Sequence, residues 1–341
     1  MDLWNLYSGM YFNRLFEEQV SNLWRQGKIS GEMHPSIGEE AITAGVLAHL
    51  IEGDALALDH RGTAAAIMRG IDPGALLDEF IGLPTGLCAG MGGHMHLFSE
   101  DHLLASSGIV GASGPAAVGF ALAAELLRPG KVAVAFFGEG SLNQGMLLES
   151  FNLAQEWQLP VIFVCKDDQW AITTDTNPNV SPVQRAQGFR LPTSSIDGND
   201  LKVVYQTAGK AIRNAREGKG PAFIHATCNH PEGHTLDNQL VRVGRRPLKE
   251  GMAITIPLLK SVFKIRGAPI IERIRAMIQT IKMIRRSASH HRPQSSDPLK
   301  HARELLIKDQ ERLDQLEATI CAEIGELFSA TGSRLTAEDS R

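Results

Sequence analysis

Cysteine is scarce in this chain of 341 residues, and the four cysteines lie far apart. Cys88, Cys165, Cys228 and Cys321 show no CxxC spacing, which argues against a disulfide-stapled fold and against a zinc site. We therefore interpret them as core thiols in a reducing compartment, and we expect a cytoplasmic location. The net charge of −4 is small, so the chain as a whole is not expected to bind nucleic acid.

Targeting and membrane-spanning patterns are also missing. The N-terminal segment MDLWNLYSGMYFNRLFEEQV has an acid at position 2 and charges spread along a helical pattern, unlike a signal or transit peptide, so we expect the mature protein to begin here. One charge-free stretch, from Leu103 to Ala124, opens with the turn-forming residues SSGIVGASGP. We predict a buried helix over the rest of this stretch rather than a membrane span.

Two common nucleotide-binding signatures are absent: a Walker lysine motif, and a G-x-G-x-x-G that opens a helix after the first strand. Instead, the chain alternates two kinds of segment. Apolar residues at helical spacing predict helices over 2–26, 38–50, 73–82, 114–127, 145–157, 200–217 and 298–330. Short apolar runs predict buried strands over 55–58, 132–137, 161–165 and 222–226. This alternation predicts a doubly wound α/β fold, with a parallel sheet covered by helices on both faces.

Acidic residues follow two of the predicted strands. Glu139 stands between two glycines after the strand over 132–137, and Asp167 and Asp168 follow the strand over 161–165. A right-handed βαβ unit brings the carboxyl ends of both strands to one rim. Ligands of open α/β sheets bind at such a rim, and paired carboxylates there suit Mg²⁺ beside a phosphate. Spacing alone leaves an alternative, in which Glu139 caps the next helix and the two aspartates form a solvated turn.

The same stretch is similar to a known cofactor motif. GEG at 138–140, followed by DDQWAIT at 167–173, resembles the thiamin diphosphate motif, which is usually written GDG and closes with two asparagines. Other segments resemble, in order, the alpha subunit of the first component of 2-oxoacid dehydrogenases, the family of pyruvate, acetoin and branched-chain dehydrogenases. They include GEEAITAGV (38–46), DHRGTA (59–64), GMGGHMH (90–96), SGIVGASGPAAVG (107–119), GSLNQG (140–145), IDGND (196–200) and GH (233–234). The resemblance covers residues 3–235, resumes near 297–330, and implies the thiamin diphosphate-binding fold.

The resemblance also implies roles for individual residues. It makes Glu139 and Asp168 side-chain ligands of Mg²⁺ and the backbone carbonyl of Trp170 a third ligand. The cofactor-binding residues that it implies are His34, His60, Arg61, Gly108, Ile109, Val110, Gly140, Ser141 and His234. The forked cation of Arg61 suits the diphosphate because it can bind phosphate through two hydrogen bonds. His234 is the expected catalytic residue, since imidazole transfers protons near neutral pH; taken alone, it would more often be a satisfied polar residue.

Six residues depart from the family pattern: His60, Glu139, Asp167, Asp168, Trp170 and His230. Glu139 stands for the commoner aspartate, as in the branched-chain relatives, so metal binding is expected to survive. Asp167 and Asp168 replace the two asparagines, and the charge of Asp168 is expected to weaken cofactor binding or to require a nearby cation. His60 and Trp170 stand where tyrosine is usual. His230 replaces an arginine, which is expected to alter how its loop holds substrate or diphosphate.

The implied function is that of an oxidoreductase subunit. The family uses thiamin diphosphate and Mg²⁺ to decarboxylate a 2-oxoacid and passes the acyl group to a lipoyl-bearing acyltransferase component. The carboxylate that activates the cofactor belongs to the beta subunit in two-gene forms, so we expect an α2β2 heterotetramer, with the glycine- and alanine-rich helix over 114–127 allowing close subunit packing. GSLNQG favours pyruvate and acetoin relatives, whereas GEG and AIT favour branched-chain ones, which leaves the substrate open.

Two other functions stay open from the sequence. The departures at His60, Asp167, Asp168 and His230 suggest a degenerate, non-catalytic cofactor-binding or assembly subunit of the same fold. A nucleotide-binding module at the sheet rim is the second alternative, and the missing motifs argue against it.

The resemblance lapses over 236–296, where the composition becomes basic. Between Arg242 and Arg292 the only acids are Glu250 and Glu272. Helical spacing gathers an apolar stripe of Ile270, Ile274, Met277, Ile278, Ile281 and Ile284, with Arg273, Arg275, Lys282 and Arg286 largely elsewhere. We expect this stripe to pack on the subunit's own core or on the beta chain; the alternative is docking of 254–292 on an anionic membrane or an acidic partner. The predicted organisation is a cofactor-binding core (1–235), a basic, partly helical insertion (236–296) and a C-terminal helix and tail (297–341) that complete the core.

Overall fold

A mixed sheet forms the centre of the molecule. The computed structural model describes residues 1–172, 174–175, 181–238, 242, 247–263, 267–290 and 297–338. The strands are β1 (Ala55–Leu58), β2 (Phe98–Ser99), β3 (Leu104–Ser106), β4 (Ala133–Gly138), β5 (Val161–Asp167), β6 (Trp170–Ala171), β7 (Thr174–Asp175), β8 (Thr193–Asp197) and β9 (Ala222–Thr227). Seven of them form one sheet in the order β2-β3-β1-β4-β5-β9-β8, parallel except for β2, while β6 and β7 pair separately. The predicted α/β fold is confirmed.

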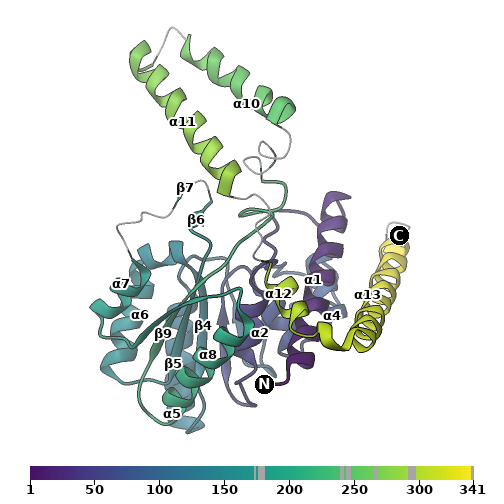
Figure 1. Ribbon diagram of the computed structural model, residues 1–341, viewed down its shortest axis with the longest axis vertical. Coiled ribbons are helices and arrows are strands. Elements are labelled where there is room, and N and C mark those ends of the chain that lie inside the picture. The colour runs from purple at the N-terminus through teal and green to yellow at the C-terminus, as the bar shows by residue number, and fades with distance from the viewer. Residues whose placement is uncertain are drawn as a thin grey trace.

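Helices cover both faces of this sheet (Figure 1). Those described are α1 (Leu3–Arg25), α2 (Glu40–Leu47), α3 (Thr63–Met68), α4 (Pro73–Ile81), α5 (Ser113–Leu127), α6 (Gly145–Glu156), α7 (Pro182–Gly188), α8 (Leu201–Arg216), α10 (Pro247–Val262), α11 (Ile270–His290), α12 (Pro298–Glu304) and α13 (Gln310–Glu338). All seven predicted helices are found. The one predicted over 298–330 is divided by a short 3₁₀ segment, Ile307–Asp309, so that α12 and α13 are separate helices.

Alternate residues of the central strands supply two different cores. In β4, Val134 and Phe136 face the core that contains residues of α1, α2, α8 and α13, whereas Ala133, Ala135 and Phe137 face the core formed with α5 and α6. All five side chains are almost fully buried. The continuous apolar runs in the sequence therefore reflect strands that are buried on both faces.

Some helix boundaries and contacts follow directly from local sequence. The carboxylate of Asp72 accepts a hydrogen bond from the backbone of Ala75 at the start of α4, and Asp200 caps α8 in the same way. Gly114 allows α5 to lie close to α6, because a Cβ atom there would come within 2.7 Å of a methyl carbon of Leu147. The small residues of α5 thus serve packing inside this chain at that point.

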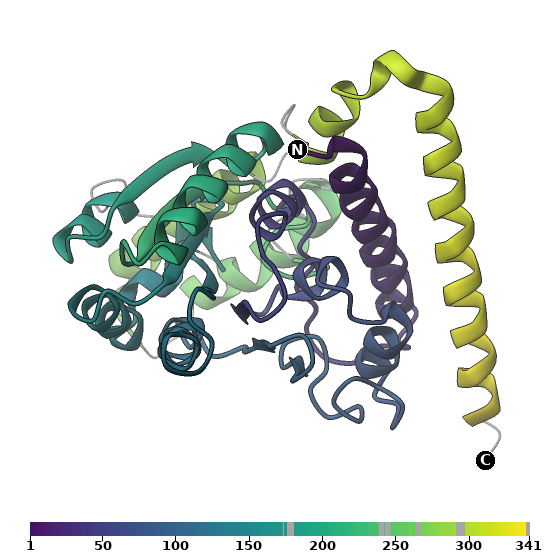
Figure 2. The same ribbon diagram turned by 90° about the horizontal axis from the view of Figure 1, so that it is seen from below.

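The C-terminal helices return to the N-terminal one. Figure 2 shows α13 running alongside α1, and Ile320 and Ile324 of α13 are buried in the same core as Phe16 of α1. The guanidinium of Arg14 donates to both carboxylate oxygens of Asp297, at 2.9 and 3.0 Å. This packing ties the residues that follow the basic segment to the sheet domain.

Cysteine burial differs from the sequence interpretation. Cys165 is a core thiol in β5, but Cys88 and Cys228 are only half-buried and Cys321 is exposed on α13. The interpretation of all four as core thiols is therefore wrong, because Cys321 lies at the exposed edge of the contact between α13 and α1, with its Sγ 3.5 Å from the hydroxyl oxygen of Tyr11. Within the described ranges, no helix is long and apolar enough to cross a membrane. The stretch that begins at Leu103 contains the predicted helix, α5, but this helix is buried on one face only, and its Leu126 and Leu127 are exposed.

The basic segment forms a helical hairpin that stands away from the sheet domain. Helices α10 and α11 pack against each other and project beyond the rim at which β6 and β7 lie (Figure 1). In the part of the chain that the structure describes, neither helix packs extensively on the sheet or its covering helices. Packing of the apolar stripe on the subunit's own core, one of the two expectations, is therefore wrong.

Candidate active site

Parallel pairing brings the acidic residues to one edge of the sheet. Gly138 of β4 lies opposite Lys166 of β5, and Asp167 lies opposite Thr227 of β9. Glu139 follows β4 directly, so it and the two aspartates lie at the carboxyl ends of adjacent strands. This is the rim at which open α/β sheets bind their ligands.

A cavity of about 410 Å³ opens at this rim. Every residue that the sequence analysis assigned to the site lines it: His34, His60, Arg61, Gly108, Ile109, Val110, Glu139, Gly140, Ser141, Asp168, Trp170 and His234. They come from segments up to two hundred residues apart. The fold thus brings the whole predicted set together.

Glu139 is a buried carboxyl group among other carboxylates. Burial, and then the negative charges of Asp168 and Asp167, raise its pKa to about 8. The group is therefore largely protonated at neutral pH unless a cation compensates its charge. A metal ion would supply that compensation. Asp167 and Asp168 are also almost fully buried, so the alternative in which they form a solvated turn is wrong.

His230 supplies the cation that Asp168 was expected to require. Its Nδ1 lies 2.8 Å from Oδ2 of Asp168, and its Nε2 lies 2.7 Å from Oε1 of Glu39. Ionised carboxylates only accept hydrogen bonds, so both ring nitrogens donate and the imidazole is charged. Burial and Arg61 oppose this charge, but the two carboxylates outweigh them and raise the pKa of His230 to about 9. Burial likewise opposes ionisation of Asp168, and His230 more than offsets it, so the pKa of Asp168 is lowered.

A buried lysine completes this network, and the sequence analysis missed it. Lys166 donates to Glu39 at 2.6 Å and to Asp59 at 3.1 Å. Burial disfavours the charge of Lys166, but both carboxylates reverse the effect and raise its pKa. The available signal was a lysine inside an apolar strand, directly before the two aspartates. Asp167 has its own partner, since Nε2 of His225 lies 2.7 Å from its Oδ2.

Three histidines that line the cavity, His34, His60 and His234, lie together, and a fourth, His94, packs against His34. The rings of His60 and His234 lie edge-on to His34, with centroids 4.6 and 5.0 Å away, and each of the three offers a nitrogen within 4.8 Å of the others. His94, which the sequence analysis did not assign, lies with Nε2 3.0 Å from Nδ1 of His34 and 3.2 Å from the backbone nitrogen of His34. Because Nε2 of His94 accepts from that backbone N–H, Nδ1 of His34 carries the proton and its Nε2 keeps a free lone pair.

These histidines are uncharged at neutral pH. Burial is the main cause, and neighbouring cations add to it: the pKa of His60 falls to about 3 and that of His234 to about 4, while that of His34 is lowered further. Nε2 of His60 is buried and has no hydrogen-bond partner in the described structure. A buried polar atom without a partner is unfavourable, so this nitrogen is ready to meet a polar ligand.

Arg61 joins the loops that carry these histidines. Its guanidinium donates to the carbonyl of Pro35 at 2.6 Å and to that of His234 at 2.8 Å, and it is almost fully buried. Nε lies 3.9 Å from Oε1 of Glu39. Arg61 therefore holds both loops in place and keeps a positive charge at the wall of the cavity.

Two loops form the remaining boundary. Gly108 lies near Met95 and His96, and the next two residues, Ile109 and Val110, are 62% and 49% exposed although they line the cavity. After β5, Gln169 and Ile172 adopt left-handed backbone conformations, with φ of 62° and 55°. Residues other than glycine rarely adopt this backbone conformation, and backbone strain of this kind is concentrated in functional loops. Trp170 lies between them with its indole donating to the carbonyl of Ile172 at 3.1 Å.

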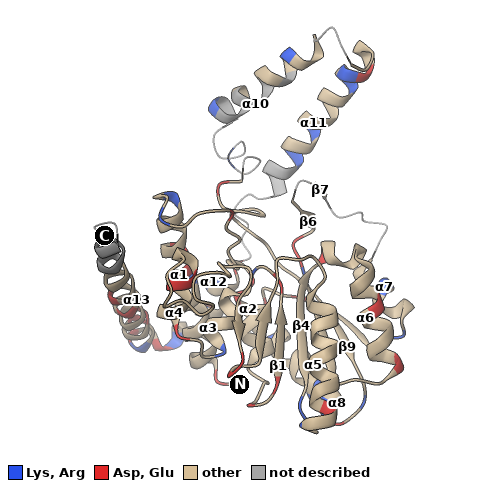
Figure 3. Cartoon of the chain, turned by 180° about the vertical axis from the view of Figure 1, so that it is seen from behind, with Lys and Arg blue, Asp and Glu red and all other residues tan. Residues whose placement is uncertain are grey.

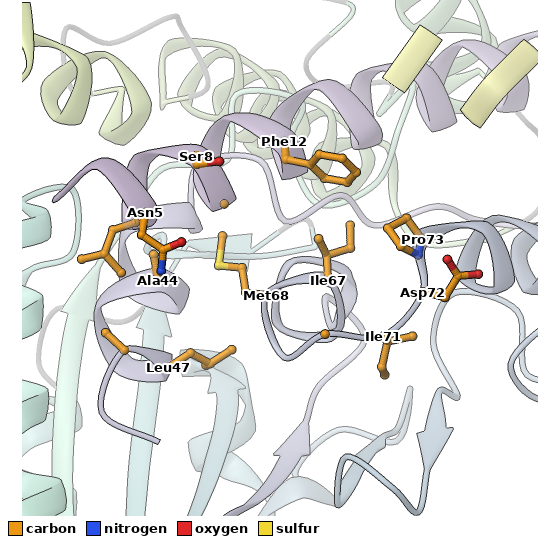
Figure 4. A pocket seen from close by; sticks show the side chains of 14 residues that line it. Asn5, Ser8, Phe12, Ala44, Leu47, Ile67, Met68, Ile71, Asp72 and Pro73 are labelled. Carbon is orange, nitrogen blue, oxygen red and sulfur yellow. The ribbon is translucent and has the colours of Figure 1, made fainter. Parts of the chain in front are cut away.

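A larger cavity, of about 800 Å³, lies elsewhere (Figure 4). It is a groove between α1, α2 and α3, lined mostly by apolar and small polar residues. Its one charged residue, Asp72, already caps α4. The groove therefore lacks the convergent polar groups that mark the rim cavity.

Comparison with known proteins agrees with this geometry. Residues 8–242 match the dehydrogenase E1 component family. The chain is 40% identical over 236 residues to the alpha subunit of acetoin:2,6-dichlorophenolindophenol oxidoreductase of Cupriavidus necator, and 39% identical to that of Bacillus subtilis; each alignment covers 68% of this chain and 71% of the relative. It is 35% identical over 242 residues to the pyruvate dehydrogenase E1 component subunit alpha of Zymomonas mobilis, covering 70% and 68%. The chain belongs to the dehydrogenase E1 component family, as an alpha subunit with oxidoreductase function.

Proposed function

We propose that this chain is the cofactor-binding half of a 2-oxoacid or acetoin dehydrogenase that uses thiamin diphosphate and Mg²⁺. The observation that carries the proposal is the composition of the rim cavity. One wall holds carboxylates that need a cation, and the other holds an arginine and neutral histidines that suit an anion. Mg²⁺ bound to a diphosphate would satisfy both walls, because the metal is the cation that the carboxylates need and the diphosphate is the anion that suits the arginine and the histidines.

Glu139, Asp168 and the carbonyl of Trp170 are the proposed metal ligands. Their oxygens are the hard donors that Mg²⁺ prefers. The raised pKa of Glu139, about 8, supports this role, because a divalent cation removes the repulsion from Asp168 and Asp167 that keeps the group protonated. His230 keeps Asp168 ionised before any metal arrives. We therefore interpret the change from asparagine to Asp168 as compensated by His230.

Arg61 and the histidines are the proposed diphosphate site. Nε2 of His60 has no hydrogen-bond partner within the described residues, and with the proton on that nitrogen it would donate to a diphosphate oxygen; His34 lines the same cavity beside it. A Cβ atom on Gly138 or Gly140 would meet its nearest neighbour at 3.9 or 3.4 Å, which is ordinary contact. Packing within the chain therefore does not require these glycines, and we propose that they leave room for the diphosphate instead.

When bound, thiamin diphosphate supplies the carbanion chemistry that decarboxylation of a 2-oxoacid requires. The residues of this chain hold and surround it. Gly108, Ile109 and Val110 form the proposed wall beside the aminopyrimidine. His234 is neutral at pH 7 and is positioned by Arg61 through its carbonyl, so we propose that it accepts or holds a proton at the imidazole.

The proposed complex contains a beta subunit, in an α2β2 arrangement, and a lipoyl-bearing acyltransferase that accepts the acyl group. Support comes from the mouth of the cavity, where Ile109, Val110 and Ile172 expose large apolar side chains that a second chain would cover. We also propose the domain division given by the sequence, with 236–296 inserted into a core of 1–235 and 297–341. The family match supports it, because it ends before α10 begins.

Coexpression with the beta subunit gene and assay with a redox dye tests the proposal. We expect no turnover by the alpha chain alone, and turnover of acetoin or of one class among pyruvate and branched-chain 2-oxoacids by the complex, dependent on thiamin diphosphate and Mg²⁺. A complex that binds the cofactor but turns over none of these substrates would support a non-catalytic subunit instead. Turnover by a monomer unaided would contradict the proposed complex.

A further inference from the structure

We propose that the α10–α11 hairpin docks this protein on an anionic membrane surface. Each helix packs mainly on the other, and the pair projects from the rim side of the sheet domain (Figures 1 and 3). The proposal concerns a region beyond the residues that match the family, which end at 242. It is independent of the reaction carried out at the rim.

Each helix of the hairpin exposes large apolar side chains. On α10 these are Met252, Ile256 and Leu259, with Phe263 directly after the helix, and on α11 they are Ile270, Ile271, Ile274 and Ile278. Phe263 is 74% exposed and Ile271 is 68% exposed. Their spacing of three, four or seven residues gathers them into a stripe on each helix. The hairpin also has an inner apolar set, since Val262 is buried and Met277, Ile281 and Ile284 are half-buried. The packing of α10 against α11 therefore covers the inner apolar set and leaves the stripes exposed.

Positive charge surrounds these stripes. Residues 247–290 contain nine Lys and Arg but only two acids, whereas the whole chain has a net charge of −4. The rest of the molecule is thus strongly acidic. Figure 3 shows Lys and Arg residues along α10 and α11. On α11, the exposed Arg275 and Lys282 each follow an exposed isoleucine by four residues, so cations and aliphatic side chains share one helical face.

This mixture fits a lipid surface better than a protein surface. The centre of a protein interface is poor in Lys and rich in Tyr and Trp, but residues 247–290 contain no Tyr or Trp and place the exposed Lys282 one helical turn from the exposed Ile278. A helix that lies in the membrane interface has this pattern, with aliphatic side chains entering the acyl boundary and cations meeting anionic headgroups. The acidic body would be repelled by the same headgroups, which orients the hairpin toward them.

The test is cosedimentation of the full-length chain, alone and with its beta subunit, with lipid vesicles. Vesicles of phosphatidylcholine are compared with vesicles that also contain phosphatidylglycerol, at low and high salt. We expect binding to the anionic vesicles only, weakened by salt. Arg275→Glu with Lys282→Glu should weaken it at least about tenfold, because each cation near such a surface contributes about fivefold. Ile274→Glu with Ile278→Glu should weaken it as well.

Matched controls come from exposed positions of the sheet domain. Lys202→Glu with Lys210→Glu on α8, and Leu126→Glu with Leu127→Glu on α5, repeat the same chemical changes elsewhere and should leave vesicle binding unchanged. Three results would overturn the proposal: no binding by the unaltered protein, equal binding to both kinds of vesicle, or binding that the hairpin variants retain. Loss of beta subunit assembly in the hairpin variants would also overturn it, because the stripes would then be covered by that subunit.

Discussion

The rim cavity and the α10–α11 hairpin both concentrate charge, but they arrange it in opposite ways. At the rim, Lys166 and His230 each lie buried between two carboxylates, and neutral histidines face the cavity. On the hairpin, cations greatly outnumber acids, and most of the cations whose side chains the structure describes are exposed. Buried, paired charges hold their geometry and are little screened by salt, whereas exposed charges act diffusely and are screened. The first arrangement suits one defined ligand, and the second suits an extended surface.

Loss of the proposed metal ligand Glu139 should have the largest effect on the rim. Glu139→Ala should weaken metal-dependent binding of thiamin diphosphate by about 100-fold or more, since changes behind a metal ligand already cost about 10- to 100-fold. The fold should persist because the change also removes a buried carboxyl group that Asp168 and Asp167 repel. Calorimetric titration with and without Mg²⁺ measures this, and Glu156→Ala on the exposed side of α6 is the control. Unchanged affinity in Glu139→Ala would end the metal assignment.

Removal of the charge between Asp168 and Glu39 should destabilise the protein. His230→Ala leaves two buried carboxylates without their shared cation, so the free energy of unfolding should fall by about 3–5 kcal/mol. His230→Arg, which restores the family's usual residue, should recover most of the loss. Chemical denaturation of the cofactor-free chain at pH 7 tests this. Equal stability of the alanine variant and the unaltered protein would show that His230 does not compensate the charges of Asp168 and Glu39.

Protonation of the buried His60 should show in the pH dependence of stability. Its pKa is about 3 in the folded chain against 6.5 for an exposed histidine, so its contribution is complete above pH 6.5 and is lost as pH falls toward 3. At pH 5 the loss is about 2 kcal/mol. His60→Tyr removes this group, so its stability relative to the unaltered chain should rise by about 2 kcal/mol between pH 7 and pH 5. The same difference should be flat between pH 7 and pH 8, and a flat profile down to pH 5 would contradict the assignment.

Substitutions on the exposed stripe of the hairpin should have the smallest effect on folding. Ile274→Ser with Ile278→Ser should lower the unfolding free energy by only about 1 kcal/mol, because the two residues are 41% and 46% exposed. Ile162→Ala in β5, where the side chain is fully buried, should cost about 2–5 kcal/mol. Thermal and denaturant unfolding of both variants makes the comparison. A large loss from the hairpin change would mean that the stripe is covered within the folded protein.

Local sequence determined most of the fold because the signals were strong and short in range. Continuous apolar runs identified β1, β4, β5 and β9, and a right-handed crossover predicted that Glu139 and Asp168 share a rim. The small strands β2, β3 and β8 were missed, since two to five residues with mixed burial leave no periodic pattern. The helical break after α12 was missed because the apolar spacing continues across it.

The partners of the site residues could not be predicted in the same way. Glu39, Lys166 and His94 reach the site through contacts with residues more than fifty positions away, and a contact of that kind has no sequence period. The hairpin shows the same limit. Its apolar spacing predicted one helix with a stripe that needs cover, corresponding to α11. It did not predict α10, or that the two helices would cover each other only in part.

Titration of the alpha–beta complex with thiamin diphosphate, followed by tryptophan fluorescence in the presence and absence of Mg²⁺, tests the central claim most directly. Trp170 lines the cavity and is almost fully buried, so it should report on occupation of the site. We predict a saturable change that requires Mg²⁺, disappears in Glu139→Ala and is retained in Ile274→Ser with Ile278→Ser. Absence of the change, or a change that is independent of Mg²⁺ and of Glu139, would contradict the account.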